Sequence, residues 1–260
     1  MSTAKIYLFA NWKMYLDATE SERMAKQLAA YSKRLPTAVE TVIFPSSLAF
    51  QGVAKAAKGS RLGVGAQNVY WVEKGGYTGE ISAAMYKRAG ARYALVGHSE
   101  RRHLFHESNH ETAQKVEAVV EAGMLPVVCV GETASERAAG QTEEVVEAQL
   151  RAAYSTVVWP LKKNPIIAYE PVWAISHGTG KDQAGKYCEP AEAEKMHHFI
   201  IKIVHDLLPA APEPVVLYGG SVRPDTVTDY LSEPNVGGVL VGAASTVLSS
   251  WKTIIADALK

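Results

Sequence analysis

The sequence lacks the features that mark secreted, membrane-bound or nucleic-acid-binding proteins. Its 260 residues contain two cysteines, Cys129 and Cys188, which are too few for a disulfide framework and form no C-x-x-C motif. No apolar run approaches the roughly 18 residues of a transmembrane helix, and the first apolar stretch, 6–10, is too short for a signal peptide. Lysine plus arginine equals aspartate plus glutamate, at 27 each, so no charge excess attracts nucleic acid or an anionic membrane. These absences predict a soluble cytoplasmic protein that binds neither.

Eight short apolar runs recur along the chain, and most of them are rich in β-branched residues. They lack the alternation of half-exposed strands, which indicates strands buried on both faces, as in a parallel sheet. The predicted strands are 6–10, 39–44, 62–66, 93–97, 126–130, 166–169, 215–218 and 238–241.

Stretches of helical period separate these runs. Ser108 and Glu111 predict a capping box at the start of a helix over 111–122, and Gly123 predicts its end. Further helices are predicted over 193–207 and 246–259. Eight strand-helix units of about 32 residues match the size of a βαβ module. A doubly wound sheet is compatible with this pattern, but the regular repeat without a linker favours a single (β/α)8 barrel domain over residues 1–260.

In such a barrel the chemistry lies just after the strands, and polar residues do occur there. Taken singly, a lysine or glutamate at a loop start is usually solvated, and a histidine beside a strand is more often structural than catalytic. Their joint placement at one rim favours a functional site. The residues concerned are Asn11, Lys13, Gln67, Asn68, His98, Ser99, Glu100, Glu132, Glu170, Ser221 and Gly242.

The strings around these positions resemble the triosephosphate isomerase family. The most specific are Asn-Trp-Lys at 11–13, Val-Gly-His-Ser-Glu-Arg-Arg at 96–102, Ala-Tyr-Glu-Pro-Val-Trp-Ala at 168–174 and Tyr-Gly-Gly-Ser-Val at 218–222. The resemblance runs in order along nearly the whole chain. It implies an isomerase that moves a proton between adjacent carbons of a three-carbon phosphate through an enediolate, with no cofactor and no metal.

The resemblance also implies a role for each residue. Glu170 is expected to be the base and His98 a neutral hydrogen-bond donor to the developing oxyanion. Lys13 supplies positive charge, Asn11 orients the substrate, and Glu100 supports the site.

The phosphate is expected to be held by backbone N–H groups rather than by a basic side chain. The matching positions are Gly178, Ser221, Gly242 and Ala243. Ala243 departs from the glycine usual in the family. Its amide donor remains, provided that alanine tolerates the local backbone angles.

The lid loop after Glu170 is longer than in typical family members. Ser176 and His177 precede Gly178, and residues 182–189 replace a shorter segment. This leaves open an alternative substrate, a four-carbon ketose phosphate such as erythrulose phosphate. A non-catalytic barrel is a third hypothesis, and the intact lysine, histidine and glutamate set argues against it.

Three other motifs do not fit their context. His106 and His110 match H-E-x-x-H, but a helix start at Ser108 leaves His106 outside the helix, which argues against a zinc site. The Gly-Thr-Gly-Lys string at 178–181 lacks the spacing of a nucleotide P-loop. The pair His197-His198 is expected to be packed or solvated.

The segment from Gly75 to Glu80 matches the loop that family members insert into a partner subunit. The resemblance therefore implies a homodimer in which Thr78 lies near the partner's Asn11 and the partner's Lys13. Tyr70 and Trp71 are expected to be buried against the partner, since aromatic residues are enriched at interfaces.

Overall fold

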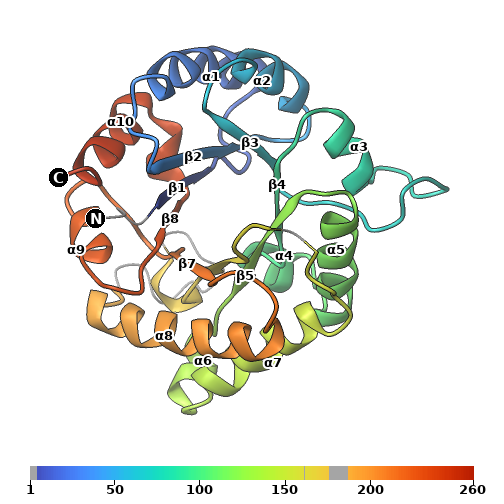
Figure 1. Ribbon diagram of the computed structural model, residues 1–260, viewed down its shortest axis with the longest axis vertical. Helices are drawn as coiled ribbons and strands as arrows, with labels where there is room; N and C mark the ends of the chain where they lie inside the picture. The colour runs from blue at the N-terminus through green and yellow to red at the C-terminus, as the bar shows by residue number, and fades with distance from the viewer. Residues whose placement is uncertain (1–4, 161, 176–186) are drawn as a thin grey trace.

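The computed structural model describes residues 5–160, 162–175 and 187–260, and its centre is a closed parallel barrel (Figure 1). Each strand pairs with the next along the chain, and β8 pairs with β1. This confirms the predicted (β/α)8 barrel. The strands are β1 (Ile6–Asn11), β2 (Val39–Phe44), β3 (Gly63–Ala66), β4 (Tyr93–Val96), β5 (Leu125–Val130), β6 (Ile166–Tyr169), β7 (Val215–Tyr218) and β8 (Gly238–Val241).

Helices form a ring outside the strands, as Figure 1 shows. The α-helices are α1 (Ala18–Ser32), α2 (Phe50–Ala57), α3 (Ala83–Arg88), α4 (Ser99–Leu104), α5 (Asn109–Glu121), α6 (Ala134–Ala138), α7 (Thr142–Tyr154), α8 (Pro190–Leu207), α9 (Val227–Leu231) and α10 (Leu248–Asp257). Two 3₁₀ turns, η1 (Val172–Ala174) and η2 (Ala243–Thr246), follow β6 and β8.

The eight strands occur where the sequence predicts them, with four limits shifted by one residue. The capping box of Ser108 and Glu111 is present at the start of α5, and Gly123 follows its end with φ +68°. The helix predicted over 246–259 is wrong at its start. Val247 is extended (φ −106°, ψ 117°), so it separates the short turn η2 from α10.

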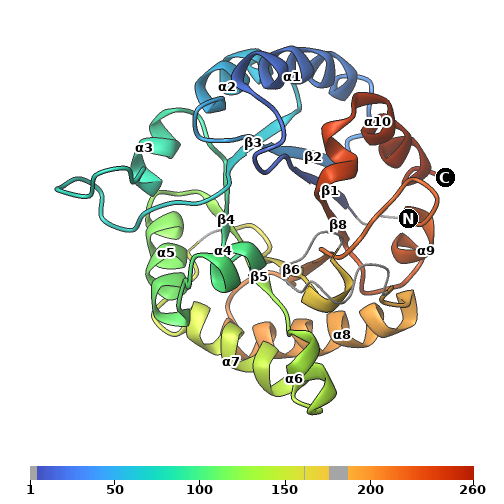
Figure 2. The same cartoon turned by 180° about the vertical axis from the view of Figure 1, so that it is seen from behind.

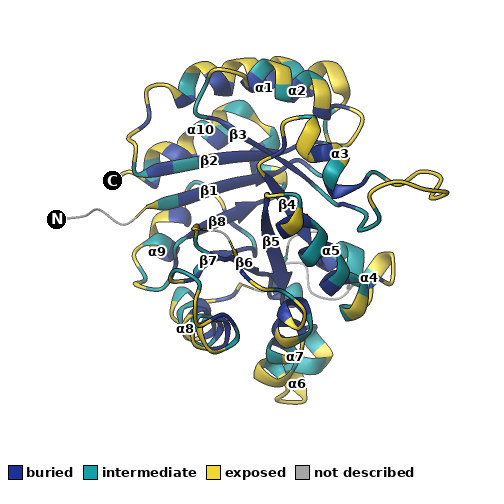
Figure 3. Ribbon diagram, turned by 45° about the vertical axis from the view of Figure 1, so that its right-hand side comes forward, coloured by how far each residue is buried: buried dark blue, intermediate teal, exposed yellow. Residues whose placement is uncertain are grey.

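Burial follows the layering of the barrel. The strands are almost wholly buried, and the helices are exposed on their outer faces (Figure 3). Within the described residues, none of the helices has the length and apolar character that crossing a bilayer requires.

One histidine of the predicted pair is buried between α8 and the barrel. His197 is 0% exposed; its Nδ1 lies 3.2 Å from the Asn235 carbonyl oxygen, and its ring meets that of Tyr169 edge-on. His198 beside it is exposed. Burial lowers the pKa of His197 to about 4, although the Asn235 carbonyl acts in the opposite direction. The packed and solvated interpretations of the pair are thus both confirmed, one for each residue.

His197 should make the fold sensitive to acid. Below pH 6.5 the unfolded chain binds a proton on this imidazole, whereas the folded chain does not until about pH 4. The free energy of unfolding should therefore fall by about 3 kcal/mol from this residue alone as the pH drops through that interval. Urea unfolding at pH 7 and 4.5 measures it: His197→Gln should weaken the pH dependence, while His198→Gln should leave it as in the wild type. An unchanged dependence in His197→Gln would contradict this assignment.

Candidate active site

The carboxyl ends of the strands surround a cavity of about 210 Å³. Figure 2 looks onto this end, where α4 lies in front of the strands. The cavity is lined by Asn11, Lys13, Tyr15, His98, Glu170, Ile175, Leu240 and the segments 219–223 and 242–244. The structure thus brings together sequence-predicted residues from five strand ends, those of β1, β4, β6, β7 and β8. Glu100 does not line this cavity but contacts Lys13, and Gly178 lies outside the described residues.

Lys13 adopts a left-handed backbone conformation, with φ +47°, in which the L-residue costs roughly 1–2 kcal/mol. Two hydrogen bonds hold it there, and a third anchors one of the two partners. The Lys13 N–H donates to Oδ1 of Asn11 (3.0 Å), and Nε2 of Gln67 donates both to the Lys13 carbonyl and to the Phe44 carbonyl (2.8 Å each). Gln67 therefore ties the chain after β1 to the end of β2, and the strain persists because the surroundings over-determine the conformation.

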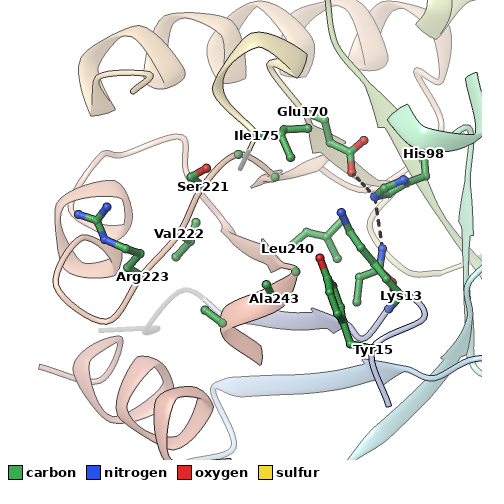
Figure 4. Close-up of a pocket in the computed structure, with 15 residues that line it drawn as sticks. Lys13, Tyr15, His98, Glu170, Ile175, Ser221, Val222, Arg223, Leu240 and Ala243 are labelled. Atoms are coloured by element: carbon green, nitrogen blue, oxygen red, sulfur yellow. Dashed lines mark hydrogen bonds and ion pairs between the residues drawn. The ribbon is translucent and has the colours of Figure 1, made fainter. Parts of the chain in front are cut away.

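His98 is the N-cap residue of α4, and its tautomer follows from its contacts. The Glu100 backbone N–H donates to Nδ1 of His98 at 3.2 Å. A nitrogen that accepts a hydrogen bond carries no proton, so the neutral imidazole holds its proton on Nε2. That nitrogen points into the cavity, 3.2 Å from Oε1 of Glu170 and 3.3 Å from Nδ2 of Asn11 (Figure 4).

Glu170 follows β6 and is 2% exposed. Its carboxylate accepts a hydrogen bond from the Ser99 backbone N–H at 2.8 Å and faces Nε2–H of His98. Two donors at the start of α4 thus compensate the burial of the charge. The side chain lies at the edge of the cavity with both carboxylate oxygens engaged.

The ammonium of Lys13 enters the cavity from below Glu170 and His98 in Figure 4. It donates to Oε1 of Glu100 at 2.7 Å, and the pair is partly buried. Among the residues lining the cavity, Arg223 is another cation, but its guanidinium pairs with Asp225 and points away from the cavity. Lys13 is therefore the cation best placed to meet an anionic ligand.

The opposite side of the cavity is formed by the segments after β7 and β8, which include Ser221, Val222 and Ala243 (Figure 4). The Ser221 hydroxyl donates to the Ala174 carbonyl at 2.8 Å, which ties the loop after β7 to η1. Gly242 and Ala243 form the start of η2. Positive φ angles of described non-glycine residues occur at Lys13 and His106, so Ala243 does not need the left-handed conformation that favours glycine.

The sequence places Glu132 among the polar residues at the rim but predicts no individual role for it; in the structure it organises the first turn after Glu170. The carboxylate is fully buried and accepts from Nε1 of Trp173 (2.6 Å) and from the Tyr169 hydroxyl (3.1 Å). The Arg137 guanidinium lies 3.9 Å from the Trp173 ring centre and pairs with Glu192 of α8. Burial raises the pKa of Glu132, and the Trp173, Tyr169 and Arg137 contacts oppose that rise. Its position two residues after β5 is the signal that placed it at the rim.

A second cavity, of about 520 Å³, adjoins the first and shares Asn11, Lys13, Tyr15 and His98 with it. Its remaining wall carries exposed apolar side chains, among them Met14, Leu104 and Phe105.

The segment from Gly75 to Glu80 projects from the molecule beside α3 (Figures 1 and 3) and is exposed throughout.

The structure confirms the prediction that His106 lies outside the helix that contains His110. His106 lies before α5 with φ +56°, and His110 lies within that helix. The two imidazoles therefore do not share one helical face. The string at 178–181 lies outside the described residues.

Comparison with known proteins gives one family. The family model described as triosephosphate isomerase matches residues 6–258. The chain is 38% identical over 253 residues to a triosephosphate isomerase of Rhodopirellula baltica, covering 96% of each protein. It is 40% identical over 247 residues to one of Chloroflexus aurantiacus, covering 94% of this chain and 96% of the relative. It is 37% identical over 254 residues to one of Protochlamydia amoebophila, covering 97% and 93%.

The Glu132 network predicts a stability effect that depends on pH. Trp173→Phe removes a donor from a buried carboxylate, which should cost about 1–3 kcal/mol in the free energy of unfolding. The substitution also raises the pKa of Glu132 further, so the folded chain binds the proton more tightly than the unfolded chain, and the loss should be largest at pH 8 and partly relieved at pH 5. Trp159→Phe is a matched control, because its indole donates to the Lys163 carbonyl and its effect should be equal at both pH values. Equal losses for Trp173→Phe at the two pH values would refute the charge-based explanation.

Proposed function

The chain belongs to the triosephosphate isomerase family, and from this premise we propose that its rim cavity interconverts dihydroxyacetone phosphate and D-glyceraldehyde 3-phosphate. One observation carries the assignment of the cavity. A buried carboxylate, a neutral imidazole N–H and an ammonium converge on the same small space, opposite the segments that follow β7 and β8. This is the set of groups that a proton transfer between adjacent carbons requires.

Glu170 acts as the base. Its carboxylate removes a proton from the carbon next to the substrate carbonyl, the electron pair moves onto the carbonyl oxygen, and an enediolate forms. Return of the proton to the neighbouring carbon then gives the isomeric product. For this the carboxylate leaves the Ser99 N–H, where it is held now, and turns toward the substrate.

His98 and Lys13 stabilise the charge that develops on oxygen. The Nε2–H of His98 is free to donate to either substrate oxygen once Glu170 has turned away, and Asn11 lies beside it. The Lys13 ammonium reaches the same region. Its bond to Glu100 keeps the ammonium in place between turnovers and compensates its charge when the cavity holds no substrate.

The phosphate binds at the side of the cavity formed by the segments after β7 and β8. We assign the donors to the N–H groups of Ser221, Gly242 and Ala243, and Gly178 remains a proposed donor outside the described residues. The Ser221 N–H lies 3.3 Å from the Ala174 carbonyl, a long hydrogen bond that a phosphate dianion can replace.

The alternative substrate has no support. The relatives compared above are all named triosephosphate isomerase, and none of their names refers to a four-carbon ketose phosphate. The non-catalytic barrel is disfavoured by the same relatives and by the complete set of polar groups around the cavity.

We further propose a cytoplasmic homodimer. The exposed loop from Gly75 to Glu80 and the apolar wall of the second cavity are complementary elements, one projecting and one recessed. The ring of Tyr70 stacks on that of Trp71, with centroids 4.0 Å apart, and this contact holds the base of the loop in place.

The cysteines support the cytoplasmic location. Both are unpaired and buried, as suits a reducing compartment, and burial raises the pKa of the Cys188 thiol to about 12.

An isomerase assay with glyceraldehyde 3-phosphate, run in parallel with a tetrulose phosphate, tests the reaction. Glu170→Gln keeps the side-chain shape and removes the proton acceptor, so turnover should fall by about two to four orders of magnitude with folding intact. Glu143→Gln, the same change at an exposed position of α7, should leave turnover unchanged. Near wild-type turnover in Glu170→Gln would remove this residue from its role, and a preference for the tetrulose phosphate would overturn the proposed substrate.

The dimer is tested by a charge placed in the second cavity. Phe105 is 64% exposed in the isolated chain, and Phe105→Glu should shift sedimentation from dimer to monomer and lower activity, since the partner's loop would no longer reach the site. Val158→Glu alters an exposed apolar residue between α7 and β6 and should leave the dimer intact. A wild-type chain that sediments as a fully active monomer at sub-micromolar concentration would exclude the proposal.

A further inference from the structure

We propose that Tyr230 is a positioning residue for the phosphate-binding loop 219–221, and that it acts through Tyr218. The inference rests on the proposed function, because it takes this loop to hold the substrate phosphate. Tyr230 belongs to α9 in the outer ring and does not line the cavity. Its influence must therefore pass through another side chain.

The first link joins Tyr230 to Tyr218. The two rings are stacked, with centroids 4.0 Å apart and planes 16° from parallel, and the hydroxyl oxygens lie 3.3 Å apart. Both residues are 0% exposed. A stacked, fully buried pair leaves the Tyr218 ring no room to tilt or slide independently of Tyr230.

The second link joins Tyr218 to the loop. A Cβ placed on Gly220 would lie 2.2 Å from the Tyr218 hydroxyl oxygen, so the Gly220 backbone rests directly against that hydroxyl. Gly219 is held from the other side, where a Cβ would lie 2.8 Å from Cγ of Glu170. The position of the Tyr218 ring therefore sets how close loop 219–221 stands to the cavity.

The third link fixes Tyr230 itself. Its hydroxyl donates to the Cys188 carbonyl at 2.7 Å, and that residue, also 0% exposed, lies just before α8. The ring of Tyr187 approaches that of Tyr230 at 6.0 Å. Burial raises the pKa of both Tyr218 and Tyr230, so the hydroxyls stay protonated and the hydrogen bonds persist across the pH range in which the protein is folded. The start of α8, α9 and the end of β7 are thus joined beneath the loop.

Two substitutions separate the contributions of ring and hydroxyl. Tyr230→Leu removes the stack, and Tyr230→Phe keeps it but removes the bond to the Cys188 carbonyl. In phosphorus NMR titrations with inorganic phosphate, the dissociation constant should rise about 5- to 10-fold in the leucine variant and about 2- to 3-fold in the phenylalanine variant. The KM for glyceraldehyde 3-phosphate should rise in parallel while kcat stays within about two-fold, because the Glu170 carboxylate is held by the Ser99 N–H and faces His98, and the substitutions touch neither residue.

Tyr154→Phe is the matched control. Tyr154 in α7 is also buried, at 4% exposed, and its hydroxyl has no partner among the described residues, so the change removes a buried tyrosine hydroxyl without affecting the loop. It should alter neither the dissociation constant nor KM.

A lowered melting temperature with unchanged phosphate affinity in both Tyr230 variants would show a packing role alone and overturn the proposal. A loss of kcat without a change in phosphate affinity would overturn it as well. Tyr230→Phe deletes a single oxygen atom and retains the stack, so it provides the test where the leucine variant does not fold. A wild-type chain that binds phosphate but does not isomerise the triose phosphate would instead reject the proposed function.

Discussion

The rim of the barrel depends on one hydrogen bond, from the Glu100 backbone N–H to Nδ1 of His98. Because Nδ1 accepts, the imidazole is neutral and Nε2–H points into the cavity. An imidazolium there would form a charged pair with Glu170 and hold the carboxylate against α4. The neutral ring makes a weaker contact that the carboxylate can leave. A single backbone donor at the first turn of a six-residue helix thus decides both what His98 can donate to and how readily Glu170 can move.

The conformation of Lys13 likewise depends on hydrogen bonds to its backbone. The chain turns at Lys13 in the left-handed conformation, with φ +47°, and the Lys13 side chain lines the cavity. Asn11 and Gln67 provide the hydrogen bonds that hold this turn, and Asn11 also faces His98. The polar residues at the ends of β1, β3 and β4 therefore form one connected set: the side chains of Asn11 and Gln67 both hold the Lys13 backbone, and Asn11 contacts His98.

Most of the fold could be predicted from the sequence, because burial on both faces leaves an unambiguous apolar run at each strand and local capping determines α5. The break at Val247 could not, since it depends on how the chain turns over β8. At the site, the polar residues after the strands could be identified in the sequence, and the motifs implied their roles.

The hydrogen bonds from Gln67 to two carbonyls and from Trp173 to Glu132 could not be predicted, because their partners lie far away in sequence and meet only when the barrel closes.

Gly219 shows why the two sides of the cavity must be considered together. A Cβ at this position would lie 2.8 Å from Cγ of Glu170 and 3.1 Å from the Tyr169 carbonyl oxygen, so the loop after β7 touches the side chain of the base. The adjacent Gly220 rests on Tyr218. The spacing between the base and the segment after β7 is consequently set by direct contact, through residues without side chains. In a small substrate the reacting carbon and the anionic group are only a few bonds apart. The spacing between the base and the segment that binds the anionic group must therefore be fixed to a fraction of an ångström. The glycines after β7 allow this close packing, and the tyrosines beneath them limit how far it can relax.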